Sequence, residues 1–174
     1  MYRSTDNGEN WTTSIEPENI KYDEYFEYNA ADIQTILITS SGEIYVGTGI
    51  LSNKGVLYSK DNGNTWTMKS NGLSSRDSRN ILSLFMGHDG TLYASTLAGI
   101  YHSTDGGDNW LLQHSGPNID LGKNGGGVAQ VKEFVASTDG SIFATACQAG
   151  VIKSTDKGVT WNQFNAGLNI FTEH

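Results

Sequence analysis

The octapeptide Ser103-Thr104-Asp105-Gly106-Gly107-Asp108-Asn109-Trp110 carries most of the information about how this chain folds. Its pattern, Ser-x-Asp-x-Gly-x-x-Trp, occurs four times in the 174 residues. The residues that all four copies share are Ser4, Asp6, Gly8 and Trp11; Ser59, Asp61, Gly63 and Trp66; Ser103, Asp105, Gly107 and Trp110; and Ser154, Asp156, Gly158 and Trp161. The tryptophans recur at intervals of 44 to 55 residues, a period too long for a leucine-rich or helical repeat.

Each copy of the motif predicts a tight hairpin turn that its own side chains hold together. The aspartate and serine oxygens can bond backbone groups inside the turn, and the glycine supplies the positive φ that the turn needs. The residues just before the motif alternate as in a strand, for example Gly99-Ile100-Tyr101-His102. We expect the tryptophan to start the returning strand and to bury its ring against the sheet. The motif is therefore predicted to be scaffold.

A second hairpin precedes each complete motif. In one unit, Asp89-Gly90 separates the strand-like run Leu82-Ser83-Leu84-Phe85 from Thr91-Leu92-Tyr93-Ala94-Ser95. Ser41-Gly42 and Asp139-Gly140 take the same place in the other units. A glycine turn between two alternating runs is a strong hairpin signal. Each period therefore holds four antiparallel strands, A to D, which is the composition of a β-propeller blade.

The predicted fold is all-β: a β-propeller of four-stranded antiparallel blades, of which about three and a half are present. We assign residues 1–13 to a half-blade of strands C and D, residues 33–68, 79–114 and 131–165 to three blades, and residues 166–174 to an exit tail. Closed propellers have about four to eight blades, and open sheet edges invite association. We therefore expect a segment of a longer propeller, since the chain starts and stops within a unit; the alternative is a ring that several copies complete.

The repeats resemble the BNR or Asp-box repeat of sialidases, sortilin-type receptors, xyloglucanases and photosystem II assembly factors. The pattern Ile-Tyr-x-Ser-Thr-Asp-x-Gly-x-x-Trp, preceded by Asp-Gly-x-Leu-Tyr-Ala-x-Thr, is most similar to secreted bacterial repeat proteins of the Bacteroidetes and Ignavibacteria. The resemblance covers nearly the whole chain and implies a protein that is secreted or displayed at the cell surface. It implies no single activity, because this box occurs in proteins with unrelated functions.

Composition narrows the range of partners. The net charge of −8 repels phosphate backbones, so nucleic acid is not an expected partner. No apolar stretch approaches the roughly 18 residues of a membrane span, so we expect no membrane insertion. Cys147, the single cysteine, is expected to be a small buried side chain rather than a nucleophile. We expect no cofactor, and we expect any export signal to be absent from this chain or to have been removed.

The candidate ligand face lies at the end of the blades that carries the D–A and B–C connections. These connections vary in length, whereas the A–B turns and the Asp boxes are short and uniform. The first D–A connection contains Tyr22, Asp23, Glu24 and Tyr25, whose rings could stack on sugars while the carboxylates bind hydroxyls; the alternative is an ordinary surface loop. The other candidates on this face are Arg76, Arg79, His114 and Asp120, and for the two arginines the alternative is solvated charge.

No catalytic or metal-binding residue is predicted. A sialidase needs an arginine cluster, whereas the arginines of this chain are Arg3, Arg76 and Arg79, and the Phe/Tyr-Arg-Ile-Pro motif is missing. Glycoside hydrolysis needs two carboxylates across a cleft, and the boxes and turns already account for Asp6, Asp61, Asp89, Asp105, Asp139 and Asp156. The histidines lack the spacing of metal ligands. We therefore expect a non-catalytic module that binds protein or polysaccharide; the alternative is a fragment of a xyloglucanase- or sialidase-like hydrolase with catalytic residues partly on other blades.

Overall fold

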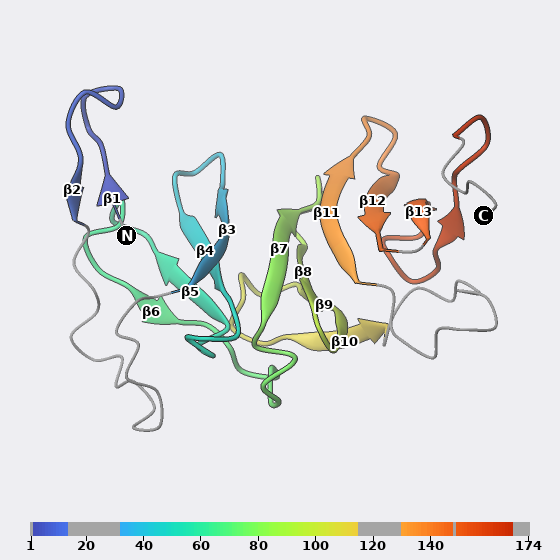
Figure 1. Ribbon diagram of the computed structural model, residues 1–174, viewed down its shortest axis with the longest axis horizontal. Coiled ribbons are helices and arrows are strands. Elements are labelled where there is room, and N and C mark those ends of the chain that lie inside the picture. The colour runs from blue at the N-terminus through green and yellow to red at the C-terminus, as the bar shows by residue number, and fades with distance from the viewer. Residues whose placement is uncertain (1, 14–31, 115–129, 148, 169–174) are drawn as a thin grey trace, which may run out of the picture.

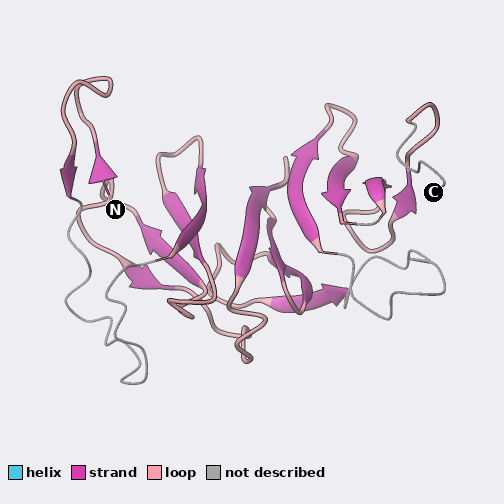
Figure 2. Ribbon diagram, viewed as in Figure 1, coloured by secondary structure: helices cyan, strands magenta, loops and turns pink. Residues whose placement is uncertain are grey.

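The structure is a computed structural model that describes residues 2–13, 32–114, 130–147 and 149–168. Every regular element in these ranges is a β-strand, and none of them contains a helix (Figure 2). The strands form a two-stranded sheet and three four-stranded sheets in which all neighbours are antiparallel. The predicted all-β propeller fold is confirmed, with three full blades after a half-blade.

The strands follow one another along the chain in the order in which they pair. The half-blade contains β1 (Tyr2–Arg3) and β2 (Thr12–Thr13). Blade 1 contains β3 (Ile33–Ile38), β4 (Ile44–Thr48), β5 (Val56–Ser59) and β6 (Thr67–Met68). Blade 2 contains β7 (Ile81–Met86), β8 (Leu92–Thr96), β9 (Gly99–Ser103) and β10 (Leu111–His114). Blade 3 contains β11 (Val131–Ala136), β12 (Ile142–Ala146), β13 (Gly150–Ser154) and β14 (Asn162–Gln163).

The first strand of every full blade carries an irregularity at the same place. The pairing register shifts between Ile33 and Thr35, between Ile81 and Ser83, and between Val131 and Glu133. A β-bulge of this kind bends its strand and increases the local twist. The repeated bulge therefore gives the three blades the same shape, which lets them stack in the same way.

The blades stand side by side in an arc, with the half-blade at one end and blade 3 at the other (Figure 1). Strand β7 packs against β3 of the preceding blade and against β11 of the following blade. Two apolar clusters fill the spaces between successive blades, and each contains residues of both neighbours. The first cluster includes Tyr45 and Leu73 of blade 1 with Leu84 and Trp110 of blade 2. Each blade thus buries its faces against its neighbours, as repeat units do.

The turns and connections between strands lie at two opposite ends of the blades. The A–B turns, where Gly42, Gly90 and Gly140 have φ of +84°, +82° and +83°, lie at the same end as the Asp boxes (Figure 1). The B–C connections and the described D–A connection, between β6 and β7, lie at the other end. This arrangement follows from antiparallel order, because every second connection returns to the same end of a sheet.

Two sequence-based expectations about side chains were wrong. The tryptophans precede the returning strands, and their burial differs: Trp110 and Trp161 are buried, Trp66 is half-buried, and Trp11 is exposed. The surroundings of the ring differ as well. Trp66 packs against apolar residues of its own blade and Trp161 contacts Phe134 of its own blade, whereas the Trp110 indole bonds the Lys69 carbonyl of the preceding blade. Cys147 is also exposed, because β12 ends at Ala146 and the cysteine lies in the following turn.

Candidate functional site

The four Asp boxes share one pattern of hydrogen bonds. In blade 2, Ser103 Oγ donates to Asp105 Oδ1 (2.7 Å) and accepts from the backbone N–H of Gly107 (2.8 Å). Asp105 Oδ1 accepts the backbone N–H of Asn109 (2.9 Å), and Oδ2 accepts the Asn109 side-chain amide (2.8 Å). Corresponding serine and aspartate bonds recur in the other three boxes. Each box is therefore a hairpin turn closed by its own residues.

These donors hold the box aspartates in the ionised form. The side-chain amide and backbone N–H of Asn109 lower the pKa of Asp105 to about 2. The Thr65 hydroxyl and N–H lower the pKa of Asp61 to about 2, and Asn10 does the same for Asp6, mainly through its backbone N–H. The Thr160 hydroxyl lowers the pKa of Asp156. A general acid needs a pKa near the working pH. These ionised carboxylates therefore serve as hydrogen-bond acceptors within the turn and are unsuited to donating a proton.

The box of blade 2 also docks on blade 1. The backbone carbonyl of Gly106 accepts the hydroxyl of Tyr45 (3.1 Å) and the ammonium of Lys69 (2.9 Å). Lys69 pairs with Asp108 of the same box (2.8 Å). Burial raises the pKa of Tyr45 to about 12, so this hydroxyl keeps its proton. The Asp box thus joins blades as well as closing a turn.

The junction between blades 2 and 3 repeats this arrangement with other residues. The carbonyl of Lys157 accepts the hydroxyl of Tyr93 (3.1 Å) and the side-chain amide of Gln113 (2.7 Å). The Lys157 ammonium pairs with Asp89 (2.8 Å), and this ion pair lowers the pKa of Asp89 to about 2. Sequence reasoning missed these anchors, although an aromatic residue in strand B of each full blade, Tyr45, Tyr93 or Phe143, was a visible signal.

A pocket of about 110 Å³ lies beside this junction. Its lining includes His88, Asp89, Tyr93, Ile142 and Lys157, all near the box end of blades 2 and 3. Ligand sites for small molecules are typically 300–1,000 Å³, so this pocket is too small for a sugar chain or a peptide. Its charged residues pair with each other across the blades.

At the opposite end, the connection from blade 1 to blade 2 forms a compact turn. Ser78 is buried, and its hydroxyl and that of Ser75 each accept the backbone N–H of the other residue (2.9 and 3.0 Å). Arg79 donates from Nε to the carbonyl of Leu73 (2.8 Å), whereas Arg76 is exposed. The two predicted arginines therefore differ: Arg79 stabilises the turn and Arg76 is presented to solvent.

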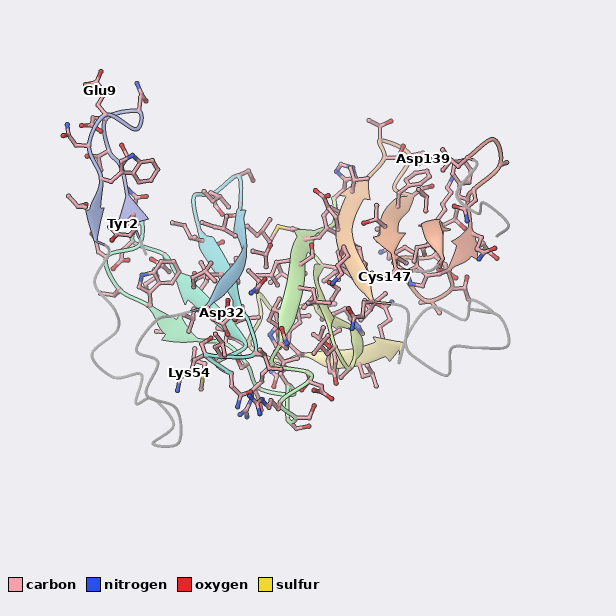
Figure 3. All side chains as sticks on the ribbon, in the orientation of Figure 1. Tyr2, Glu9, Asp32, Lys54, Asp139 and Cys147 are labelled. Atoms are coloured by element: carbon pink, nitrogen blue, oxygen red, sulfur yellow. The ribbon has the colours of Figure 1, made fainter. Side chains whose placement is uncertain are left out.

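Other polar residues lie at this same end. Figure 3 shows Asp32, Lys54 and Cys147 there, while Glu9 and Asp139 lie at the box end. In the loop from Gly49 to Lys54, the Gly49 N–H donates a hydrogen bond to the Asp32 carbonyl (2.6 Å). The same loop exposes Ile50 and Leu51 to solvent. This end thus combines exposed apolar and charged groups.

Most of the predicted ligand-face residues lie outside the described part of the chain. These residues are Tyr22, Asp23, Glu24, Tyr25 and Asp120. The backbone of His114 is described and pairs with Ile100 at the end of β10. The predicted face is therefore represented by Arg76, Arg79 and the backbone of His114.

No group of three or more histidine, cysteine, aspartate or glutamate side chains in the described ranges could hold a metal ion. In the same ranges, no helix has the length and apolar character needed to cross a bilayer.

The sequence of the first box identifies the repeat. Residues 2–13 match the BNR/Asp-box repeat family. The chain carries BNR-type propeller repeats. The three later boxes have the same residues and the same hydrogen bonds, and each stands between strands C and D of a blade. A search of curated proteins found no matching relative.

Solved structures similar to the chain are β-propeller proteins of differing function. YCF48 bound to D1 peptide matches 98% of this chain and 48% of its own, with 18% identity and a TM-score of 0.63. An ancestral GH74 enzyme matches 80% of this chain and 21% of its own, with 20% identity and a TM-score of 0.58. Virginiamycin B lyase from Staphylococcus aureus matches 77% and 41%, with 14% identity and a TM-score of 0.55. This chain spans between a fifth and a half of these proteins, and the likeness shows the fold alone.

Proposed function

We propose that the chain is part of a non-catalytic propeller that binds a protein or polysaccharide partner at the end of the blades opposite the Asp boxes. We place this propeller outside the cell, either secreted or at the cell surface, in keeping with the proteins that its repeats resemble. The observation that carries the proposal is the difference between the two ends. At the box end the exposed side chains, such as Trp11 and Val159, lie on short, uniform turns whose carboxylates and carbonyls bond within the turn or to the adjacent blade. At the other end, loops of differing length expose Arg76, Ile50 and Leu51.

A rigid box end and an exposed opposite end are what a binding scaffold needs. Binding residues occur preferentially on loops that a rigid framework positions, and here the boxes and inter-blade contacts provide that framework. An exposed guanidinium can bind carboxylates or hydroxyls, and exposed aliphatic side chains add apolar contact area. The similarity to YCF48 bound to D1 peptide supports a peptide partner, and the similarity to a GH74 enzyme supports a glycan.

The proposal is tested by presenting the purified chain to two arrays and one substrate panel. The arrays carry plant and bacterial oligosaccharides and synthetic peptides, and the panel consists of fluorogenic glycosides. We expect saturable binding on an array, weakened by Arg76→Ala and unaffected by Glu9→Gln at the box end. Binding that is lost with Glu9→Gln and kept with Arg76→Ala would place the site at the wrong end.

The second candidate function is a segment of a glycan-active hydrolase, which the GH74 likeness favours. Turnover of any fluorogenic glycoside by the chain would establish this candidate and refute a non-catalytic role. The location outside the cell is tested separately, by assaying culture medium, cell surface and cytoplasm with an antibody. Protein confined to the cytoplasm would contradict it.

A further inference from the structure

The pocket between blades 2 and 3 lies between two complete blades. Its walls come from the A–B turn and β8 of blade 2 and from β11, β12 and the Asp box of blade 3. Both blades have all four of their strands, so the opening does not arise from a missing part of either one. The apolar part of the lining consists of Ala136 with Tyr93 and Ile142, which are almost fully buried.

A comparison with the junction between blades 1 and 2 explains why the pocket is open. Gly87 takes the place of Thr39 in blade 1, because each donates its backbone N–H to the carbonyl four residues later (2.9 Å in both turns). Ala136 takes the place of Met86, because these are the last residues of β11 and β7. Thr39 is buried, and Met86 packs against the apolar cluster between blades 1 and 2. The pocket therefore has a glycine and an alanine where the other junction has two larger side chains.

Contacts across the junction hold the walls of the pocket in place. The Tyr93 hydroxyl bonds the Lys157 carbonyl, and the Lys157 ammonium pairs with Asp89. His88 Nε2 lies 3.1 Å from the Ser137 carbonyl oxygen. A site that is formed before its ligand arrives has a smaller ordering cost on binding. The pocket is thus preorganised.

The size of the pocket suits one side chain. Its volume is about 110 Å³. An apolar cavity of about 150 Å³ holds benzene, so the smaller pocket fits an alkyl or thioether group. In the junction between blades 1 and 2 the chain itself supplies such a group, from Met86. The pocket therefore fits the side chain of a methionine or a leucine.

The mouth of the pocket is polar and carries both signs of charge. The side chains of Asp89 and Lys157 are 38% and 73% exposed, and His88 is exposed as well. The peptide groups that flank a side chain carry N–H donors and C=O acceptors, which a carboxylate and an ammonium can bind. An apolar pocket with a polar rim is also the usual form of an anchor site in a protein interface.

We propose that this pocket binds one methionine or leucine side chain of a peptide partner, and that the residues at its mouth bind the peptide backbone beside it. The pocket lies at the Asp-box end and contains none of Arg76, Ile50 and Leu51. The inference is therefore independent of the proposed binding end, and it adds a separate site for a single side chain.

NMR of isotope-labelled methyl groups tests the proposal, with Ala136 and Ile142 as reporters. The probe is N-acetyl-methionine methylamide, and N-acetyl-alanine methylamide is the matched probe. We expect saturable shifts of both reporters with the methionine probe at about 1–10 mM, because one buried side chain gives only weak affinity. The alanine probe, which leaves most of the pocket empty, should bind at least about tenfold more weakly.

Ala136→Met places the residue of blade 2 in the pocket of blade 3. Read through the Ile142 methyl groups, this variant should bind the methionine probe at least about tenfold more weakly. Val135→Met is the matched control, because its neighbouring side chain on β11 is 60% exposed and does not line the pocket. Gly87→Thr fills the pocket from blade 2, where a Cβ would lie 3.4 Å from the Tyr93 ring, and repeats the test if Ala136→Met does not fold.

The source of the side chain is tested with the pentapeptide Gly-Gly-Met-Gly-Gly and with ethyl methyl sulfide, which is the side chain alone. We expect the peptide to bind at least about tenfold more tightly, because it also reaches the mouth of the pocket. Equal binding of the sulfide would refute a peptide partner. An absence of shifts with the methionine probe, or shifts that Ala136→Met and Gly87→Thr leave unchanged, would overturn the site itself.

Discussion

In each Asp box one serine hydroxyl serves both the aspartate and the glycine. Ser103 is almost fully buried and accepts the N–H of Gly107, which is also buried. Ser103→Ala leaves this N–H without its acceptor, and we expect the free energy of unfolding to fall by about 1–3 kcal/mol. Urea denaturation measures the change. Ser4→Ala is the matched control, because Gly8 is exposed and water can replace the lost oxygen; an equal loss in both variants would contradict this reasoning.

The box aspartates make stability depend on pH in one direction. The pKa of Asp6, Asp61 and Asp105 is about 2 in the folded chain, below the ordinary value of 3.8. A lowered pKa means that the stabilisation is fully present above the ordinary pKa and is lost as pH falls through the folded value. We therefore expect the melting temperature to decrease steadily between about pH 4 and pH 2.

Thermal unfolding at a series of pH values measures this dependence. Replacing a box aspartate by asparagine, as in Asp105→Asn, should lower the melting temperature at pH 7 and flatten the acid slope. Glu133→Gln, which changes an exposed carboxylate on β11 outside any box, is the control. A slope that Asp105→Asn leaves unchanged would mean that other groups govern acid unfolding.

At the scale of the element, the blade exits provide a matched pair of glycines. Gly72 and Gly167 both have positive φ, so alanine at either costs about 1–2 kcal/mol of backbone strain. At Gly72 the new methyl group also collides with the Trp110 carbonyl, which adds about 1–3 kcal/mol. We expect Gly72→Ala to be clearly more destabilising than Gly167→Ala in denaturant unfolding of the dilute chain. Equal losses would show that the close contact between Gly72 and the Trp110 carbonyl does not matter for stability.

The elements were largely predictable from sequence because their signals are local. Alternating residues, the Asp89-Gly90 and Asp139-Gly140 turns and the four boxes depend on neighbours along the chain, and the strands formed where the pattern indicated. The burial of Trp11, Trp66 and Trp110 was not predictable from their shared motif. It depends on tertiary packing, since Trp66 packs on its own blade while Trp110 is also covered by blade 1, and the motif carries no signal for this difference.

At the scale of the whole molecule, the candidate site was harder to predict than the fold. Arg76 and Arg79 look equivalent in sequence, yet Arg79 donates to the Leu73 carbonyl and Arg76 is exposed. The difference arises from the three-dimensional turn around the buried Ser78. Cys147 was misjudged for a related reason, since its exposure depends on where β12 ends. The assignment of Tyr22, Asp23, Glu24, Tyr25 and Asp120 to a ligand face stays a prediction, because they lie outside the described residues.

In the whole molecule, we assign stability to the Asp-box end and binding to the opposite end. The most direct test compares Arg76→Ala and Asp105→Asn on the oligosaccharide and peptide arrays, at a temperature where circular dichroism shows both variants folded. We predict at least about tenfold weaker binding for Arg76→Ala and unchanged binding for Asp105→Asn. Folded Asp105→Asn that has lost binding, together with Arg76→Ala that binds like the unmodified chain, would contradict the account.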